Sequence, residues 1–139
     1  MLLKNDEVIE KLSRWLNAWN EHNLEAVVAI LHDNVVFENW DGQIVKGKQN
    51  LRKIWAPWFM FHGNFNFICE DAFFSEKEQK LVFQWVLEWP SLEAKYKGDR
   101  ELRKGIDIIH FNNGEIILKS SYSKTEITIN GRLLQLHAV

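Results

Sequence analysis

The first half of the chain places its hydrophobic residues at helical spacing. Over residues 6–20 they recur at positions i, i+3 and i+7, which line one side of a helix. A short second helix is expected after Asn23, a residue type that caps helix N-termini well. A third helix should follow Gly47 and kink or end near His62, because Pro57 removes a backbone donor from its interior.

The hydrophobic period changes to two in the second half of the chain. Alternating hydrophobic and polar residues are typical of strands that bury one face. The longest alternation runs over residues 81–89, and residues 91–100 are polar and predicted to form a loop. Further strands are predicted at 35–40 and 64–69, and residues 126–136 are predicted to form a strand extension and tail after the hairpin described next.

Residues 103–122 are predicted to form a β-hairpin around which the rest of the chain is organised. Two runs rich in Ile and Phe flank Asn113-Gly114, a dipeptide that tolerates the positive φ angles of a type I′ turn. Because the predicted helices come first in the chain and most strands follow them, we predict an α+β fold. Its sheet should be curved and antiparallel, with about three helices packed on the concave face. The 139 residues are expected to form a single domain, 1–139.

The composition is that of a globular protein and narrows the classes of partner. Hydrophobic residues make up 46% and charged residues 26%, and the net charge of -2 indicates neither nucleic-acid nor anionic-membrane binding. Cys69 is the only cysteine, so no internal disulfide can form. The N-terminus carries acids where a secretory signal needs an apolar run, and no stretch reaches the ~20 apolar residues of a membrane span. We therefore expect a cytoplasmic protein.

The aromatic content is unusual for a chain of this length. Aromatic residues make up 13% and include seven Trp. Large aromatic side chains either pack a core or line a cavity for a flat, apolar ligand. The sequence leaves both interpretations open.

One carboxylate falls within the predicted hairpin on an apolar face. Asp107 shares a strand face with Ile109 and Phe111, because strand side chains alternate sides. A buried carboxylate is costly unless it is hydrogen-bonded, protonated or used. In the alternative interpretation Asp107 faces water at a sheet edge, and Ile106 and Ile108 point inward.

Three segments resemble the SnoaL-like branch of the nuclear transport factor 2-like superfamily. They are R-W-L-N-A-W-N-E-H-N-L-E-A-V-V-A-I-L-H-D-N-V-V-F-E-N, G-K-Q-N-L-R-K-I-W and G-I-D-I-I-H-F-N-N-G-E-I, within residues 14–122. This superfamily includes polyketide cyclases, ketosteroid isomerases, scytalone dehydratases, limonene epoxide hydrolases and binding proteins. The resemblance implies a cone with an internal cavity, and a homodimer through the outer face of the sheet.

Only some functional residues of the family are present at the matching positions of this sequence. The hydroxyl-bearing Tyr of the isomerases falls on Trp15 and their general base falls on Asn39, an amide that cannot abstract a proton. Their oxyanion-hole acid, and the acid/base of the cyclases, fall on Asp107. The epoxide hydrolases have Arg at the position of Gly105 and Tyr at the position of Phe37, so their triad is incomplete here.

These comparisons give a set of candidate site residues. Asp107 is the expected acid/base, with a pKa raised by an aromatic pocket. The family implies an inward-facing Tyr122, and Asn39 could orient a water or a carbonyl. His62 is expected to be a buried structural histidine rather than a catalytic one. The expected walls of the ligand pocket are Trp15, Trp19, Trp55, Phe59, Trp85 and Ile109.

The sequence thus favours a protein that binds a small apolar or aromatic molecule in an enclosed pocket. Asp107 would support cyclisation, isomerisation, hydration or dehydration there without a cofactor, and no metal-ligand spacing is present. The alternative is a non-catalytic binding or association module of the same fold, in which the Trp-rich interior is only core. A protein-interaction adaptor is a third possibility, and it would require an exposed apolar patch.

Overall fold

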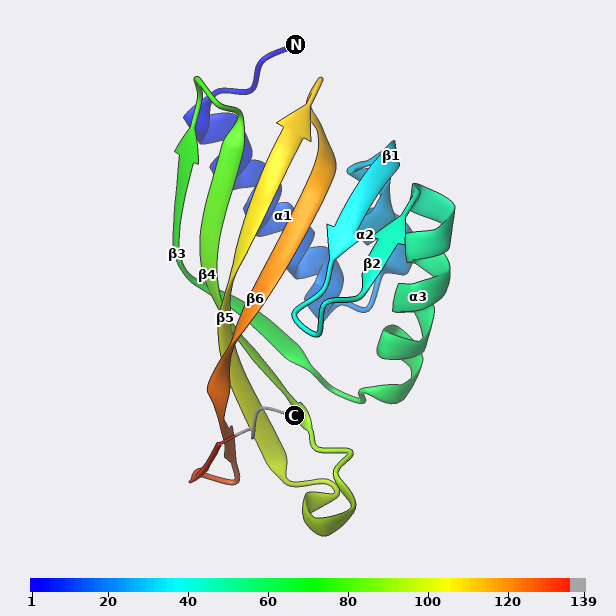
Figure 1. Ribbon diagram of the computed structural model, residues 1–139, viewed down its shortest axis with the longest axis vertical. Helices are drawn as coiled ribbons and strands as arrows, with labels where there is room; N and C mark the ends of the chain where they lie inside the picture. The colour runs from blue at the N-terminus through cyan, green and yellow to red at the C-terminus, as the bar shows by residue number, and fades with distance from the viewer. Residues whose placement is uncertain (136–139) are drawn as a thin grey trace.

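The computed structural model describes residues 1–135 and has an α+β architecture (Figure 1). Three helices and a curved, unclosed sheet of seven strands make up the fold. A short 3₁₀ turn at Ala94–Tyr96 lies in the segment predicted as a loop. The elements, in chain order, are α1 (Asn5–Asn20), α2 (Leu24–Ala29), β1 (Leu31–Glu38), β2 (Ile44–Lys46), α3 (Lys48–Phe61), β3 (Asn66–Ser75), β4 (Lys80–Pro90), β5 (Arg100–Asn112), β6 (Glu115–Ile129) and β7 (Arg132–Gln135).

The predicted elements are confirmed, with differences in where some of them begin and end and with one strand added. The chain forms β1 directly after α2, four residues before the predicted start of that strand, and the short β2 was not predicted. Residues 126–135 divide between the end of β6 and β7, and Leu136 of the predicted final segment lies outside the described residues. The Pro inside α3 leaves the helix continuous to Phe61, and His62 caps it.

The sheet is mixed rather than wholly antiparallel. Its strand order is β2-β1-β6-β5-β4-β3, with β7 paired to β6. All pairs are antiparallel except β1 with β6. The two strands run the same way because β1 enters the sheet beside the start of β6, where the Ile116 N–H donates to the Ile30 carbonyl (3.0 Å).

The β5–β6 hairpin turns at the predicted dipeptide and contains a bulge. Asn113 and Gly114 have φ angles of 52° and 80°, as a type I′ turn requires. Phe111 pairs with Ile116 whereas His110 pairs with Leu118, so Ile117 is an extra residue in β6. The bulge changes which β6 side chains face the helices.

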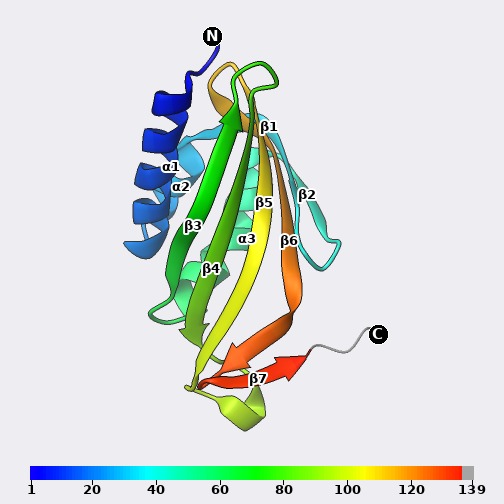
Figure 2. The same ribbon diagram turned by 90° about the vertical axis from the view of Figure 1, so that its left-hand side faces the viewer.

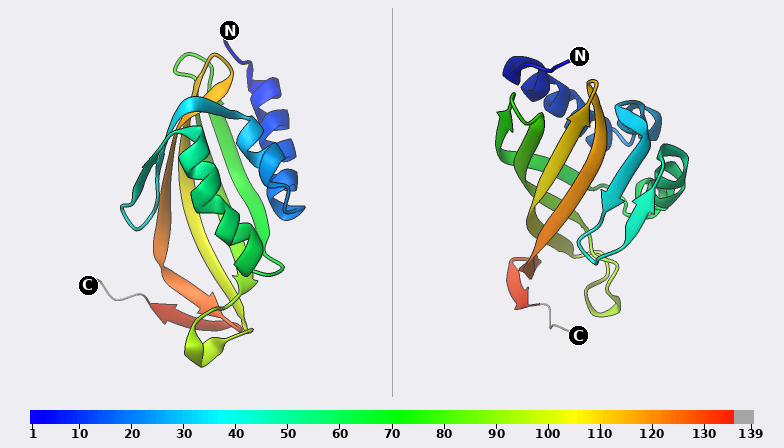
Figure 3. Two further views of the ribbon diagram at one scale, coloured as in Figure 1. Left: turned by 90° about the vertical axis from the view of Figure 1, so that its right-hand side faces the viewer. Right: turned by 45° about the horizontal axis from the view of Figure 1, so that its top comes forward.

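The helices cover only the concave face of the sheet. Figures 2 and 3 show α1 and α3 on the same side of the strands, with α1 along β3 and α3 across the other half. At the end of α1 the Asn20 amide bonds both backbone groups of Phe67 on the edge strand β3, donating to its carbonyl (2.9 Å) and accepting from its N–H (2.6 Å). No helix within residues 1–135 is both long and apolar enough to cross a membrane.

Candidate functional site

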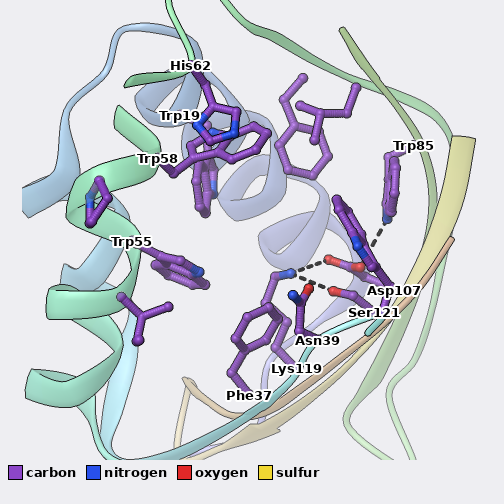
Figure 4. Close-up of a pocket in the computed structure, with 15 residues that line it drawn as sticks. Trp19, Phe37, Asn39, Trp55, Trp58, His62, Trp85, Asp107, Lys119 and Ser121 are labelled. Carbon is purple, nitrogen blue, oxygen red and sulfur yellow. Dashed lines mark hydrogen bonds and ion pairs between the residues drawn. The ribbon is translucent and has the colours of Figure 1, made fainter. Parts of the chain in front are cut away.

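A pocket lies between α3 and the concave face of the sheet (Figure 4). Its volume is about 270 Å³, just under the range usual for small-molecule sites. Most of its wall is aromatic or aliphatic, and the polar groups come mainly from β5, β6 and the end of β1. The lining residues are Trp19, Phe37, Asn39, Trp40, Ile54, Trp55, Pro57, Trp58, His62, Phe67, Trp85, Leu87, Asp107, Lys119 and Ser121.

Asp107 points into this pocket from β5. The residue is 0% exposed, and Ile106, its neighbour, lies on the outer face. This placement matches the inward interpretation of the strand and excludes the water-facing alternative. The carboxylate Oδ1 accepts a hydrogen bond from Nε1 of Trp85 on the neighbouring strand β4 (3.0 Å).

A buried lysine, which the sequence analysis missed, faces Asp107. Nζ of Lys119 lies 2.8 Å from Oδ2 of Asp107 in an ion pair, and donates a hydrogen bond to the Ser121 hydroxyl (2.9 Å). The ammonium also lies over the Phe37 ring, 4.7 Å from its centroid. The site therefore contains two opposite charges within an aromatic wall, instead of the single carboxyl that was expected.

Gly105 makes room for the indole that holds Asp107. Trp85 and Gly105 are directly paired across β4 and β5. A Cβ at position 105 would overlap the Trp85 ring and the Tyr122 carbonyl. Because Gly105 has no side chain, the Trp85 ring fits against β5 at this position. Its Nε1 can then reach the carboxylate of Asp107.

Asn39 reaches the same end of the pocket from the loop after β1. Its backbone closes the β1–β2 turn, because its N–H donates to the Gln43 carbonyl (2.8 Å) and its carbonyl accepts from Gly42 (3.0 Å). Figure 4 shows its side chain beside Lys119 and Ser121. Of the three predicted catalytic residues, Asp107 and Asn39 therefore lie together.

Tyr122 does not belong to this group. Its residue is 58% exposed, and it pairs with Ile106 on the outer face of the sheet. In an ideal hairpin without a bulge, Tyr122 would share the face of Asp107. The extra residue Ile117 shifts the pairing by one position and brings Lys119 and Ser121 inward instead. The expectation of an inward-facing Tyr122 was wrong for this reason.

Three of the six predicted wall residues line the pocket, namely Trp19, Trp55 and Trp85. Trp15 is core, because its indole N–H donates to the Val27 carbonyl (2.9 Å) between α1 and α2. Phe59 stacks on Trp19 (5.0 Å between centroids) without reaching the pocket, and Ile109 is buried in the core. Helical and strand periodicity identified buried faces here, but could not say which buried residues border a void.

His62 borders the pocket and stacks on Trp58, with 3.6 Å between ring centroids. Burial lowers the pKa of its imidazole, against the opposing effects of the Trp58 carbonyl and of Glu101. Its place on the apolar side of α3 was the sequence signal, and we had interpreted it as purely structural. Within residues 1–135 no group of three or more His, Cys, Asp or Glu is arranged to hold a metal ion.

Comparisons with known proteins agree with this architecture. The model of the SnoaL-like domain family matches residues 12–118. The epoxide hydrolase/cyclase-like enzyme SalBIII, which acts in pyran ring formation in the polyether salinomycin, has a similar structure (TM-score 0.74, 14% identity, covering 86% of this chain and 93% of that one). A sequence search of curated proteins finds no match.

Two further similar structures contain bound ligands. TerC was co-crystallised with polyporic acid (TM-score 0.70, 13% identity, 84% of this chain and 91% of that one). A Mycobacterium tuberculosis protein was crystallised in complex with estradiol-17beta-hemisuccinate (TM-score 0.69, 21% identity, 86% of this chain and 94% of that one). At these identities the likeness establishes the fold alone.

Proposed function

The chain belongs to the SnoaL-like domain family, and from this premise we propose that it binds a flat, largely apolar small molecule in the pocket beneath α3. An oxygen atom of the ligand would lie at the Asp107–Lys119 pair. The fold is shared by cyclases, ketosteroid isomerases and ligand-binding proteins, so the fold leaves the activity open. The argument therefore rests on the site.

The buried ion pair is the observation that carries the proposal. Both side chains of the Asp107–Lys119 pair are almost fully buried. Removing two charges from water is expensive, and apolar side chains of similar volume are often at least as stabilising. The pair lies at the wall of a pocket that is otherwise mostly aromatic. A role in that pocket accounts for the burial of the two charges.

The pair suits acid/base chemistry on an oxygen-bearing ligand. An ammonium only donates hydrogen bonds, so Lys119 would hold a carbonyl, hydroxyl or epoxide oxygen and stabilise negative charge that develops there. Asp107 would accept or return a proton at a neighbouring carbon or oxygen. Asn39, beside Lys119 in Figure 4, would orient the same oxygen or a water. Isomerisation, cyclisation, hydration and dehydration fit this arrangement, and none of them needs a cofactor.

The ligands of similar proteins support the choice of ligand class. Polyporic acid and estradiol-17beta-hemisuccinate, which were crystallised with two of these proteins, are oxygenated molecules. The cyclase-like enzyme SalBIII supports the reaction class in the same way. We extend both to this chain as part of the proposal.

A non-catalytic binding role is the second candidate, and one observation favours it. Both carboxylate oxygens of Asp107 already have neighbours, Trp85 at 3.0 Å and Lys119 at 2.8 Å. A carboxylate held on both sides is a less available base than a free one. In this role the pair would only position the ligand.

Substitution of Asp107 by Asn separates the two roles. Binding of 2-naphthol and estrone is measured by calorimetry, and turnover is screened with enols, lactones and epoxides. For a catalyst, Asp107→Asn should lower turnover by about a hundredfold or more and leave affinity within a few-fold. Because this variant leaves Lys119 without its ion-pair partner, a thermal melt first verifies that it is folded at the assay temperature. The exposed Asp71→Asn serves as the matched control and should change neither turnover nor affinity. Binding without turnover in the wild type would assign the non-catalytic role, and failure to bind either probe would refute the proposal.

We also propose that two copies associate through the outer face of the sheet. The apolar side chains exposed on that face include Ile68, Ile106 and Tyr122. This arrangement would leave the pocket, on the opposite face, accessible in both copies.

A further inference from the structure

We propose that the ligand of this pocket is neutral and carries an oxygen atom at both ends, one at Lys119 and the other at Trp19 and His62. This inference deepens the proposed function and depends on it. It adds a second polar contact site, at the end of the pocket away from the ion pair. It thereby defines the class of ligand: a flat diol, hydroxyketone or diketone with an apolar middle.

Polar groups mark the two ends of the pocket, and those at the second end lack a hydrogen-bond partner. Among the described residues, Nε1 of Trp19 and Nδ1 of His62 are buried side-chain atoms without a hydrogen-bond partner, whereas Oδ2 of Asp107 is held by the Lys119 ammonium (2.8 Å). All four residues line the pocket. Figure 4 shows Trp19 and His62 grouped with Trp58 on one side, and Asp107 with Lys119 and Ser121 on the other. Buried polar groups in native proteins are nearly always hydrogen-bonded, so a ligand is the natural partner.

Trp19 defines the chemistry of the second end. Its residue is only 5% exposed, and its ring is fixed between Phe59, on which it stacks (5.0 Å), and Trp55, which it meets edge-on (4.9 Å). The indole Nε1–H is a donor only. The ligand must therefore present an acceptor there, as it must to the ammonium of Lys119.

His62 extends this requirement. Its ring is held by stacking on Trp58 and by an edge contact with Trp89, whose centroid lies 6.2 Å away. A neutral imidazole has one donor nitrogen and one acceptor nitrogen. A hydroxyl group can satisfy either nitrogen and can also accept from an indole N–H. Neither His62, whose pKa is lowered by burial, nor Trp19 supplies a positive charge for a carboxylate, which favours a neutral second end.

Three naphthalene derivatives test the two-ended geometry by calorimetric titration. They are 2,6-dihydroxynaphthalene, 2-naphthol and naphthalene, which share one flat ring system and differ in oxygen count. The single hydroxyl of 2-naphthol should go to Lys119, because hydrogen bonds to a charged group are the stronger ones. The diol can bind in two equivalent orientations, which raises its affinity about twofold over that of 2-naphthol. A second buried hydrogen bond should raise this ratio of affinities to about fivefold or more.

Trp19→Phe removes the indole N–H and retains an aromatic ring. This variant should lose most of the advantage of the diol and keep the affinity for 2-naphthol within about threefold. Trp15→Phe is the matched control, because its indole N–H is already bonded to the Val27 carbonyl outside the pocket. It should keep the advantage of the diol unchanged. A thermal melt verifies that both variants fold.

Three outcomes would refute the inference, and the first of them needs only the wild-type protein. If 2-naphthol binds but the diol gains twofold or less, the second site does not exist, and the Trp19 N–H is satisfied by the face of a neighbouring ring. If Trp19→Phe and Trp15→Phe reduce the advantage equally, the effect is structural and the inference is wrong. If neither 2-naphthol nor the diol binds, the proposed function fails, and this inference with it.

Discussion

Two charged residues in an aromatic wall are the most demanding feature of this molecule at the scale of single residues. Asp107 is compensated by Lys119 and by the Trp85 indole, and Lys119 by Asp107, the Ser121 hydroxyl and the Phe37 ring. Each partner is stabilising only while the other is present, because an unpaired charge would remain without water.

Removing one charge should therefore cost far more than removing both. Lys119→Met should lower the free energy of unfolding by about 3–5 kcal/mol, measured by urea denaturation. The double variant with Asp107→Leu should recover most of that loss. Arg14→Met, which breaks an exposed pair with Glu10, should change stability by less than about 1 kcal/mol. Additive losses in the double variant would contradict the mutual compensation.

His62 should make stability depend on pH. Its pKa in the folded protein lies below the ordinary histidine value of 6.5, so well above that pH the imidazole is neutral in both states and has no effect. As the pH falls below 6.5, the unfolded chain binds a proton that folded His62 does not, and stability falls until the folded pKa is reached.

His62→Phe should therefore flatten the fall in stability between about pH 7 and about pH 5, measured by chemical denaturation. The pKa of His110 is also lowered, by burial and by Lys80, so His110→Gln provides a comparison with one histidine removed outside the pocket. If the profile of His62→Phe matches that of the wild type, His62 is not held neutral.

At the scale of elements, the pairing of β4, β5 and β6 decides which side chains enter the site. The hairpin turn and the inward face of Asp107 could be predicted from Asn113-Gly114 and from alternation. The bulge at Ile117 could not, because a single extra residue leaves no composition signal, yet it replaces Tyr122 by Ser121 at the pocket. The bulge also turns Lys119 inward. A lysine in a strand usually faces water, so neither its residue type nor the alternation of the strand predicted its place in the pocket.

Gly105→Ala tests the packing of β4 against β5. The added methyl would overlap the Trp85 ring, so the indole must move away from Asp107. We expect a loss of stability of about 1–3 kcal/mol, the usual cost of overpacking. The Trp85 indole N–H resonance, followed by NMR, should lose the shift of a hydrogen-bonded group. An unchanged resonance would mean that β5 yields instead of the ring.

At the scale of the whole molecule, the two faces of the sheet differ in character. Its concave face carries the pocket, and its outer face carries exposed apolar side chains. The α+β class and the helices on the concave face followed from the order of helical and strand periodicities, and the cone-like shape was implied by the family resemblance. The parallel pairing of β1 with β6 did not, because it depends on where β1 enters the sheet, which no local pattern records.

Tyr122→Glu tests the proposed association of two copies. An uncompensated charge buried in the interface should raise the dissociation constant of the dimer by about tenfold or more, measured by sedimentation. Phe61→Glu, at the exposed end of α3, should leave the oligomeric state unchanged. A wild-type protein that sediments as a monomer at all concentrations would exclude the outer-face dimer.

The division of the pocket wall has a consequence for how new specificities arise. The charged groups lie on the hydrogen-bonded strands β5 and β6, whereas α3 contributes Ile54, Trp55, Pro57 and Trp58 and its C-cap contributes His62. Exchanging side chains along that stretch would reshape the cavity without disturbing the ion pair. The scaffold therefore allows the shape of the pocket to diversify, in evolution or in the laboratory, while its charged groups stay constant.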